Sequence, residues 1–249
     1  DEITKLVKDG HKEIVLTGIH TGHYGSDIYY SFPKLLKDIE NIEGLKRLRI
    51  SSIEITELDD EFLSVLENSK ILVDHMHIPL QSGSNEILKL MNRKYDKEYF
   101  IDKINKIRSI RPHMSITTDI IVGFPGETEE LFSETIDTVN KIRFSKIHVF
   151  PFSLRKGTKA EELPNHLDNT TKKVRVKKLM ELSKELEIEY FNKFIDKEIE
   201  FLPEIYKEGF LIGHTGNYLI VKTLGNIDEL NEIKKVKLEK IEYPYVIGK

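Results

Sequence analysis

The chain has 249 residues, with 38 lysines and arginines against 42 aspartates and glutamates, and it contains neither cysteine nor tryptophan. This length suits one large domain, or one domain with a small appendage. The absence of cysteine excludes a disulfide scaffold, a thiolate zinc site, a cysteine nucleophile and a cysteine-ligated iron–sulfur cluster within these residues. The formal net charge of −4 provides no overall attraction to nucleic acid, so any such binding depends on a local patch.

No run of 18 apolar residues occurs in the chain, so no membrane span is expected. The first residues, DEITKLVKDGHKE, lack the apolar core of a signal peptide. We therefore expect a cytoplasmic protein without a membrane partner. Composition leaves the oligomeric state open, and we expect a monomer.

Strand-like and helix-like segments alternate through the first two-thirds of the chain. Apolar and β-branched runs predict strands at residues 13–18, 47–52, 74–79, 115–123 and 146–152. Apolar residues at helical spacing predict helices at residues 1–9, 32–42, 62–66, 99–110 and 131–142. Alternation of this kind, with short connections, is typical of a parallel sheet with crossover helices.

Five predicted strands are too few to close an eight-stranded barrel, and a helix precedes the first of them. The sequence therefore predicts an α/β fold in which residues 1–165 form a partial (β/α) barrel that lacks its first strand.

The pattern changes after residue 165. A long helix is predicted at residues 170–193, within a connecting segment 166–194, and its start at Lys172–Lys178 is strongly basic. Short strands separated by glycine-containing turns then predict a small antiparallel β-barrel over residues 195–249. This barrel carries 8 lysines against 10 acidic residues, so its own charge does not attract RNA.

Polar residues and glycines follow several of the predicted strands. Gly18 ends the first strand, Glu54 follows the second, and Gln81 begins a polar turn that would suit either a ligand or a plain helix cap. Asp119 lies inside the apolar fourth strand, where a carboxylate is costly unless it is paired. Because ligands bind at the carboxyl ends of the strands in parallel barrels, we expect a ligand site at this rim.

His75 and His77 lie two residues apart on the third predicted strand, so their side chains share one face. With Asp119 and His148 as further ligands, they would suit the metal of a barrel hydrolase. The spacing alone favours two packed or hydrogen-bonded histidines, and we predict no metal site.

Two further segments have open interpretations. Phe150 and Phe152 precede Arg155 and Lys156. The phenylalanines could stack on a flat ring while the basic residues contact a phosphate. Alternatively, the phenylalanines could pack in the core and the basic residues could lie in a solvated loop. Residues 213–218 join two strands of the small barrel, as a simple hairpin turn or as an RNA contact.

Five segments, in order along the chain, resemble the strand-end motifs of the radical S-adenosylmethionine (SAM) methylthiotransferases. They are EIVLTGIHTGHYGSD, RLRISSIE, HIPLQSGSNEILKLMNRKY, TDIIVGFPGET and FPFSLRKGTKA. The tail GFLIGHTGNYLIVK resembles the C-terminal TRAM domain of that family, an RNA-binding β-barrel. The resemblance covers nearly the whole chain and implies a partial radical-SAM barrel followed by a TRAM-like barrel.

The resemblance also implies an activity. Such enzymes add a methylthio group to carbon 2 of a tRNA adenine, and TGIHTGHYG resembles the branch that acts on N6-threonylcarbamoyladenosine at tRNA position 37. The branches that act on i6A-containing tRNA or on a ribosomal protein are alternatives. The implied cofactors of the whole enzyme are SAM and two [4Fe–4S] clusters, and the implied partner is tRNA. The family's CxxxCxxC motif and N-terminal cluster domain are absent, so we expect a fragment or an incomplete relative that ligates no cluster and is inactive alone.

Matching the motifs residue by residue implies a set of cofactor contacts. These are Gly18, Glu54, Gln81, Arg93, Asp119, Phe150 and Phe152. An arginine can pair with the cofactor's carboxylate, acidic and amide side chains can accept from its amino group or ribose hydroxyls, and the phenylalanines would lie beside its adenine. No catalytic side chain is implied, because radical hydrogen abstraction needs no general base.

The implied tRNA contacts come from the basic helix start and from the loop of the small barrel. They are Lys172, Lys173, Lys177, Lys178, His214 and Tyr218. A non-catalytic RNA-binding module is a further alternative from another functional class.

Overall fold

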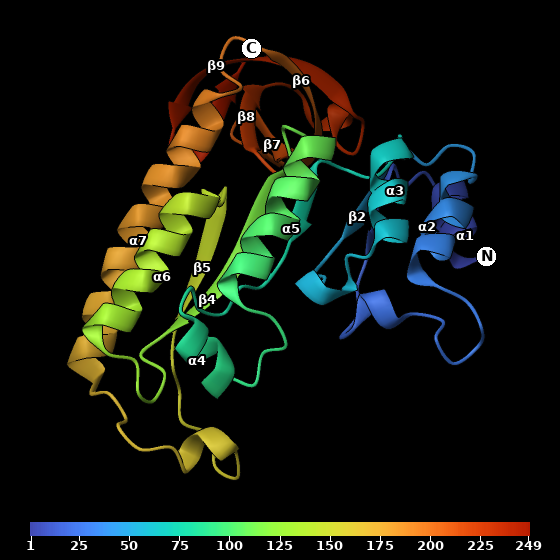
Figure 1. Cartoon of the computed structure of the whole chain (residues 1–249). Coiled ribbons are helices and arrows are strands. Elements are labelled where there is room, and N and C mark those ends of the chain that lie inside the picture. Colours follow the sequence, from blue (N-terminus) through green and yellow to red (C-terminus); the bar gives the residue numbers. More distant parts are fainter.

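The computed structural model describes residues 1–249, and Figure 1 shows two unequal parts joined by a long helix. The larger part contains five parallel strands, which are β1 (Glu13–Leu16), β2 (Arg47–Ile50), β3 (His75–His77), β4 (Ser115–Val122) and β5 (Lys146–Pro151). β1 pairs with β2 alone, β3, β4 and β5 form a second sheet in that order, and a parallel bridge between Leu48 and Leu72 joins the two sets. The predicted partial barrel of parallel strands is confirmed.

Helices alternate with these strands as predicted. They are α1 (Glu2–Lys8), α2 (Phe32–Glu40), α3 (Asp60–Asn68), α4 (Asn85–Leu90), α5 (Lys97–Ile110) and α6 (Glu129–Ile142). Polar side chains fix where several helices begin. Asp59, Asp96 and Thr128 each accept a hydrogen bond from the backbone amide three residues ahead, which satisfies a free N–H of the first turn. No helix of the chain is both long enough and apolar enough to cross a bilayer.

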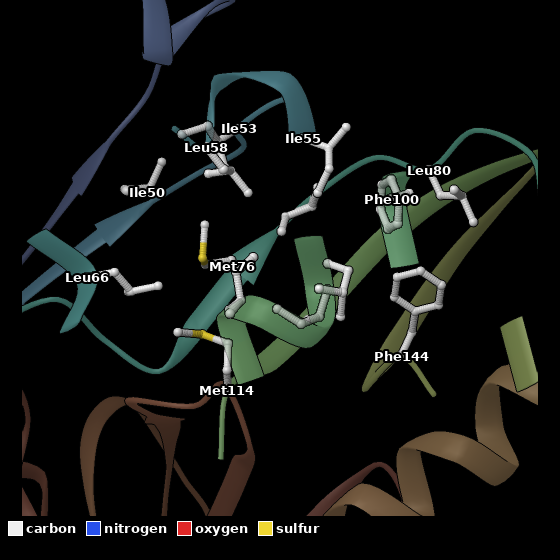
Figure 2. Packing of buried hydrophobic residues seen from close by; sticks show 14 of the residues in the cluster. Ile50, Ile53, Ile55, Leu58, Leu66, Met76, Leu80, Phe100, Met114 and Phe144 are labelled. Carbon is white, nitrogen blue, oxygen red and sulfur yellow. The ribbon is translucent and has the colours of Figure 1, made fainter. Parts of the chain in front are cut away.

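A core of 33 buried residues lies between the sheet and its helices. Figure 2 shows Met76 and Leu80 on the sheet side of this core, with Phe100 of α5 packed nearby. Because alternate residues of a strand face opposite sides, burying Ile116 and Ile120 of β4 in this core turns Thr117 and Asp119 toward the inside of the barrel. The core packing therefore creates a polar inner face.

The C-terminal part is a closed barrel of five strands, shown at the top of Figure 1. They are β6 (Glu198–Lys207), β7 (Phe210–Thr215), β8 (Ile220–Leu224), β9 (Lys234–Glu242) and β10 (Tyr245–Gly248). Four of the pairings are antiparallel, as predicted, and the fifth, between β10 and β8, is parallel. A separate core of ten buried residues fills this barrel.

Helix α7 (Asn169–Asn192) belongs to both cores. Its Leu179 and Leu186 are part of the larger core, whereas Tyr190 and Phe191 are part of the smaller one. Figure 1 shows the helix running beside α6 and β5 to the small barrel. A single straight element therefore fixes the small barrel relative to the parallel strands.

The end of β7 and the turn after it make a second connection between the two parts. Arg47 and Arg49 of β2 donate hydrogen bonds to the backbone carbonyls of His214, Thr215 and Gly216 at 3.2 to 3.4 Å. Both guanidinium groups are buried and are paired with Glu13 of β1. The small barrel therefore supplies hydrogen-bond acceptors that these buried cations need.

Candidate cofactor site and RNA surface

A chain of polar contacts crosses the polar inner face of the barrel. His77 Nε2 lies 3.3 Å from Asp119 Oδ2, and His77 Nδ1 lies 3.0 Å from the Thr117 hydroxyl. The same hydroxyl lies 3.1 Å from His75 Nε2. Asp119 thus has the partner that a carboxylate within an apolar strand requires.

The two histidines on β3 are packed and hydrogen-bonded. Burial, together with nearby Arg49 and other histidines, lowers the pKa of His75 to about 3, so this ring is neutral at neutral pH. Both His75 and His77 turn a nitrogen toward the Thr117 hydroxyl rather than toward a shared ion position. No group of three or more His, Cys, Asp or Glu side chains in the chain has the arrangement of a metal site. The geometry therefore does not support the barrel-hydrolase alternative.

Glu54 and Arg93 form an ion pair at the carboxyl rim of the barrel, with Arg93 Nη1 3.2 Å from Glu54 Oε1. The Nε of Arg93 is buried and has no hydrogen-bond partner in the chain, so one donor of this guanidinium is unsatisfied. The loop after β1 is held next to this pair by Glu57, whose buried carboxylate accepts from the amides of Gly22 and Glu54, each at 3.2 Å.

Gln81 meets Asp119 through the main chain. Its amide donates to the carbonyl of Asp119 at 2.8 Å, and its own carbonyl accepts from Ile121 at 2.9 Å. Gln81 also has a left-handed backbone, with φ of 67°. The structure therefore joins the predicted residues in two pairs, Glu54 with Arg93 and Gln81 with Asp119, and their joint role in cofactor binding stays a prediction.

The remaining predicted cofactor residues have different surroundings. Gly18 lies in the loop after β1, where an added Cβ would be 3.0 Å from Thr21 Cγ2. Phe150 lies on the inner face of β5 and is 49% exposed, so its ring is available to a ligand. The ring of Phe152 instead packs edge-on against Phe124, with centroids 5.0 Å apart. Of the two phenylalanines, only Phe150 has a largely exposed ring, and stacking on an adenine stays a prediction.

The four lysines predicted to bind RNA do not share one face of α7. At 100° per residue, Lys173 and Lys177 lie 40° apart, whereas Lys172 and Lys178 lie on the two flanks. The Lys172 ammonium donates to the carbonyl of Phe152 at 3.1 Å, and the Lys178 ammonium lies near the ring of Phe132. Lys173 and Lys177 are exposed to solvent, and Lys177 lies 3.9 Å from Glu181 in an exposed ion pair.

His214 and Tyr218 lie at the contact between the two parts of the molecule. The imidazoles of His75 and His214 stack on the Tyr218 ring with centroids 4.4 and 4.5 Å away, and Arg49 lies 4.9 Å from the same ring. His214 Nδ1 is also 2.7 Å from Glu204 Oε2. Tyr218 is still 41% exposed, and RNA binding by this loop stays a prediction.

Sequence reasoning missed Glu57, Arg47 and Arg49. The two arginines alternate on a strand whose neighbours are apolar, and this signal could have indicated buried, paired cations. Their partners, carbonyls of a loop more than 160 residues away, could not be read from any local pattern.

Comparisons with known proteins identify the family of this chain. Residues 1–139 match the Radical SAM superfamily. The chain is 46% identical, over 98% of its length, to the threonylcarbamoyladenosine tRNA methylthiotransferase MtaB of Bacillus subtilis, and 40% identical over its whole length to the MtaB of Thermotoga maritima. It is 38% identical, over 96% of its length, to the tRNA-2-methylthio-N(6)-dimethylallyladenosine synthase of Natranaerobius thermophilus. These identities confirm the resemblance to methylthiotransferases.

The chain spans little more than half of these relatives, covering 56%, 57% and 54% of their respective lengths. Among solved structures, coproporphyrinogen III oxidase (HemN) from Escherichia coli, a radical SAM enzyme, aligns with a TM-score of 0.51 and 19% identity, over 61% of this chain and 36% of that one. This second likeness concerns the fold alone. The polar rim on a partial parallel barrel and the match over more than half of the sequence lead to one conclusion: the chain belongs to the radical SAM superfamily.

Proposed function

We propose that this chain forms the SAM-binding and tRNA-binding part of a tRNA methylthiotransferase that acts on N6-threonylcarbamoyladenosine at position 37. The observation that carries the proposal is the rim itself, where the Glu54–Arg93 pair retains an unpartnered buried Nε. Support for the substrate comes from the 46% identity to a relative named for threonylcarbamoyladenosine. A cytoplasmic location and a monomeric state belong to the same proposal.

The rim residues fit the chemistry of SAM. The free Nε of Arg93 can donate to the cofactor's carboxylate, while Glu54 can accept from its amino group. Asp119, oriented by His77, can accept from a ribose hydroxyl, and the half-exposed Phe150 can stack on the adenine. When reduced by an iron–sulfur cluster, SAM supplies the radical that abstracts hydrogen. The chain has no thiolate to hold such a cluster, so the clusters of the proposed whole enzyme bind outside these residues.

Cofactor binding by the purified chain tests this assignment. We expect S-adenosylhomocysteine to bind weakly, and Arg93→Gln and Asp119→Asn each to reduce affinity by about tenfold, because each removes a charge-assisted hydrogen bond of roughly 1.5 kcal/mol. Isothermal titration calorimetry measures this effect.

Lys103→Gln is the matched control, because Lys103 donates to the Leu58 carbonyl rather than to the rim. Unchanged affinity in both rim variants would contradict the cofactor assignment. The dimethylallyladenosine branch, supported by the 38% identity, is the second candidate. Mass spectrometry of tRNA modified by the whole enzyme separates the two substrates.

A further inference from the structure

A groove runs between α7, the end of β5 and the turn that links β9 to β10. It consists of two adjoining cavities of about 530 and 290 Å³, both lined by Met180, Lys184 and Tyr243. Lys173 and Lys177 line the first cavity, and Phe150 lines the second. The groove therefore extends from a residue of the proposed cofactor site to the small barrel.

The groove has an excess of positive charge. Lys173, Lys177 and Lys184 lie within 40° of one another around α7, so their ammonium groups follow a single line. Two carboxylates lie among them. Glu187 is buried and already accepts from Lys146 and from the Tyr243 hydroxyl, while the Lys177–Glu181 pair is exposed and loose at 3.9 Å. Exposed pairs of this kind exchange readily for a phosphate contact.

The groove also has exposed ring and sulfur surface. Phe150, Met180 and Tyr243 are 49%, 57% and 41% exposed. The Tyr243 hydroxyl donates to Glu187 at 2.9 Å, and burial together with this bond raises the pKa of Tyr243 to about 12. The Lys184 ammonium lies 5.0 Å from the ring centroid. Tyr243 is therefore a fixed neutral ring with a cation beside it.

A fixed aromatic ring and a line of lysines match single-stranded RNA, in which phosphates and flat bases alternate. The geometry points to this groove as a binding site for a single-stranded segment of tRNA, with Lys173, Lys177 and Lys184 on the phosphates and Tyr243 stacked on a base. This inference rests on the proposed function. It moves the main RNA surface away from Lys172, Lys178 and Tyr218, whose side chains already contact other residues of the chain. An acidic polypeptide would use the lysines but not the ring.

The test is fluorescence anisotropy of the purified chain with a labelled tRNA anticodon stem–loop, at about 50 to 200 mM salt. Changing Lys173, Lys177 and Lys184 together to Ala should reduce affinity at least about tenfold and lower the slope of log K against log salt by about 2, since each single-strand phosphate contact contributes about 0.7. Tyr243→Ala should reduce affinity at least about fivefold with an unchanged slope, whereas Tyr243→Phe should bind within about twofold of the parent.

The matched control changes Lys8, Lys141 and Lys207, three exposed lysines on α1, α6 and β6, and should bind like the parent. Equal losses in this control and in the groove triple variant, or parental affinity in both groove variants, would overturn the groove while leaving the proposed function intact. Equal competition by polyglutamate would overturn it in favour of an acidic polypeptide. No RNA binding by the parent chain would overturn both the groove and the RNA part of the proposed function.

Discussion

His75 shows how a buried titratable group acquires its properties from distant parts of the sequence. Its Nε2 bonds to Thr117 of the neighbouring strand, and its face stacks on Tyr218 of the small barrel. Its Nδ1 is buried without a partner. The basic side chains around it are Arg49, His77, His214 and His148, and the positive charge of each disfavours a proton on the His75 ring.

This environment predicts a loss of stability in acid. The pKa of His75 is about 3 in the folded chain and about 6.5 in the unfolded chain, so the unfolded chain binds the proton first as pH falls below 6.5. The contribution is fully present above pH 6.5, and about 2 kcal/mol of it is lost between pH 7 and 5. Urea unfolding at both pH values should show a smaller loss in His75→Gln than in the parent. The exposed His11→Gln is the control, and an identical loss in all three proteins would contradict the assignment.

At the scale of elements, two glycines of the β7–β8 segment have opposite surroundings. An added Cβ at Gly213 would lie 1.8 Å from the Leu202 carbonyl oxygen of β6, whereas an added Cβ at Gly216 would meet no atom within 4 Å. Gly213 thus permits the close approach of β6 and β7, where the pairing register shifts between Pro203 and Ile205.

We therefore expect Gly213→Ala to destabilise the chain by about 2 kcal/mol or more, since the backbone atoms it meets cannot move aside. Gly216→Ala should change stability by less than about 0.5 kcal/mol, because its surroundings are open. Thermal unfolding followed by circular dichroism compares the two. Equal melting temperatures would show that the barrel can widen at this pairing.

The sequence predicted the elements well because strands and helices have different hydrophobic periods, and each strand of the parallel sheet has its own apolar run.

The sequence predicted less of the candidate site. It indicated that the Asp119 carboxylate needs a polar partner, but not that His77 is that partner. The split of the four lysines follows from the 100° helical step, so this part of the site could have been predicted. The stacking of Tyr218 on His75 and the parallel closure of β10 on β8 could not, because they depend on residues brought together only by folding.

At the scale of the whole molecule, two sets of buried contacts connect the two parts. Helix α7 enters both cores, and the buried Arg47 and Arg49 use carbonyls of the small barrel. An interface that satisfies buried cations is costly to open, because separation leaves them without their acceptors. The two parts should therefore lose structure together.

Calorimetry of the parent chain should accordingly show a single transition. A chain ending at Phe194 should melt lower by roughly 5 °C or more, because it loses several hydrogen bonds to buried arginines and exposes Tyr190 and Phe191. Arg49→Met in the untruncated chain removes two of the three arginine–carbonyl hydrogen bonds between the parts and should lower the same transition. Two separate transitions in the parent, one matching the truncated chain, would contradict this coupling.

The unpaired edge of β1 has a consequence for how the chain behaves in concentrated solution. The small barrel is closed and presents no strand edge, and α7 covers β5 with Ser183 bonded to the Ile147 amide. β1 alone ends the sheet with a side that has no strand partner, beside the 47% exposed Val15. Such an edge can act as a template that pairs with another extended segment. An edge formed by a short strand with a charged residue is a poor site for aggregation. β1 has only four residues and contains Glu13, so its edge disfavours the growth of long fibrils.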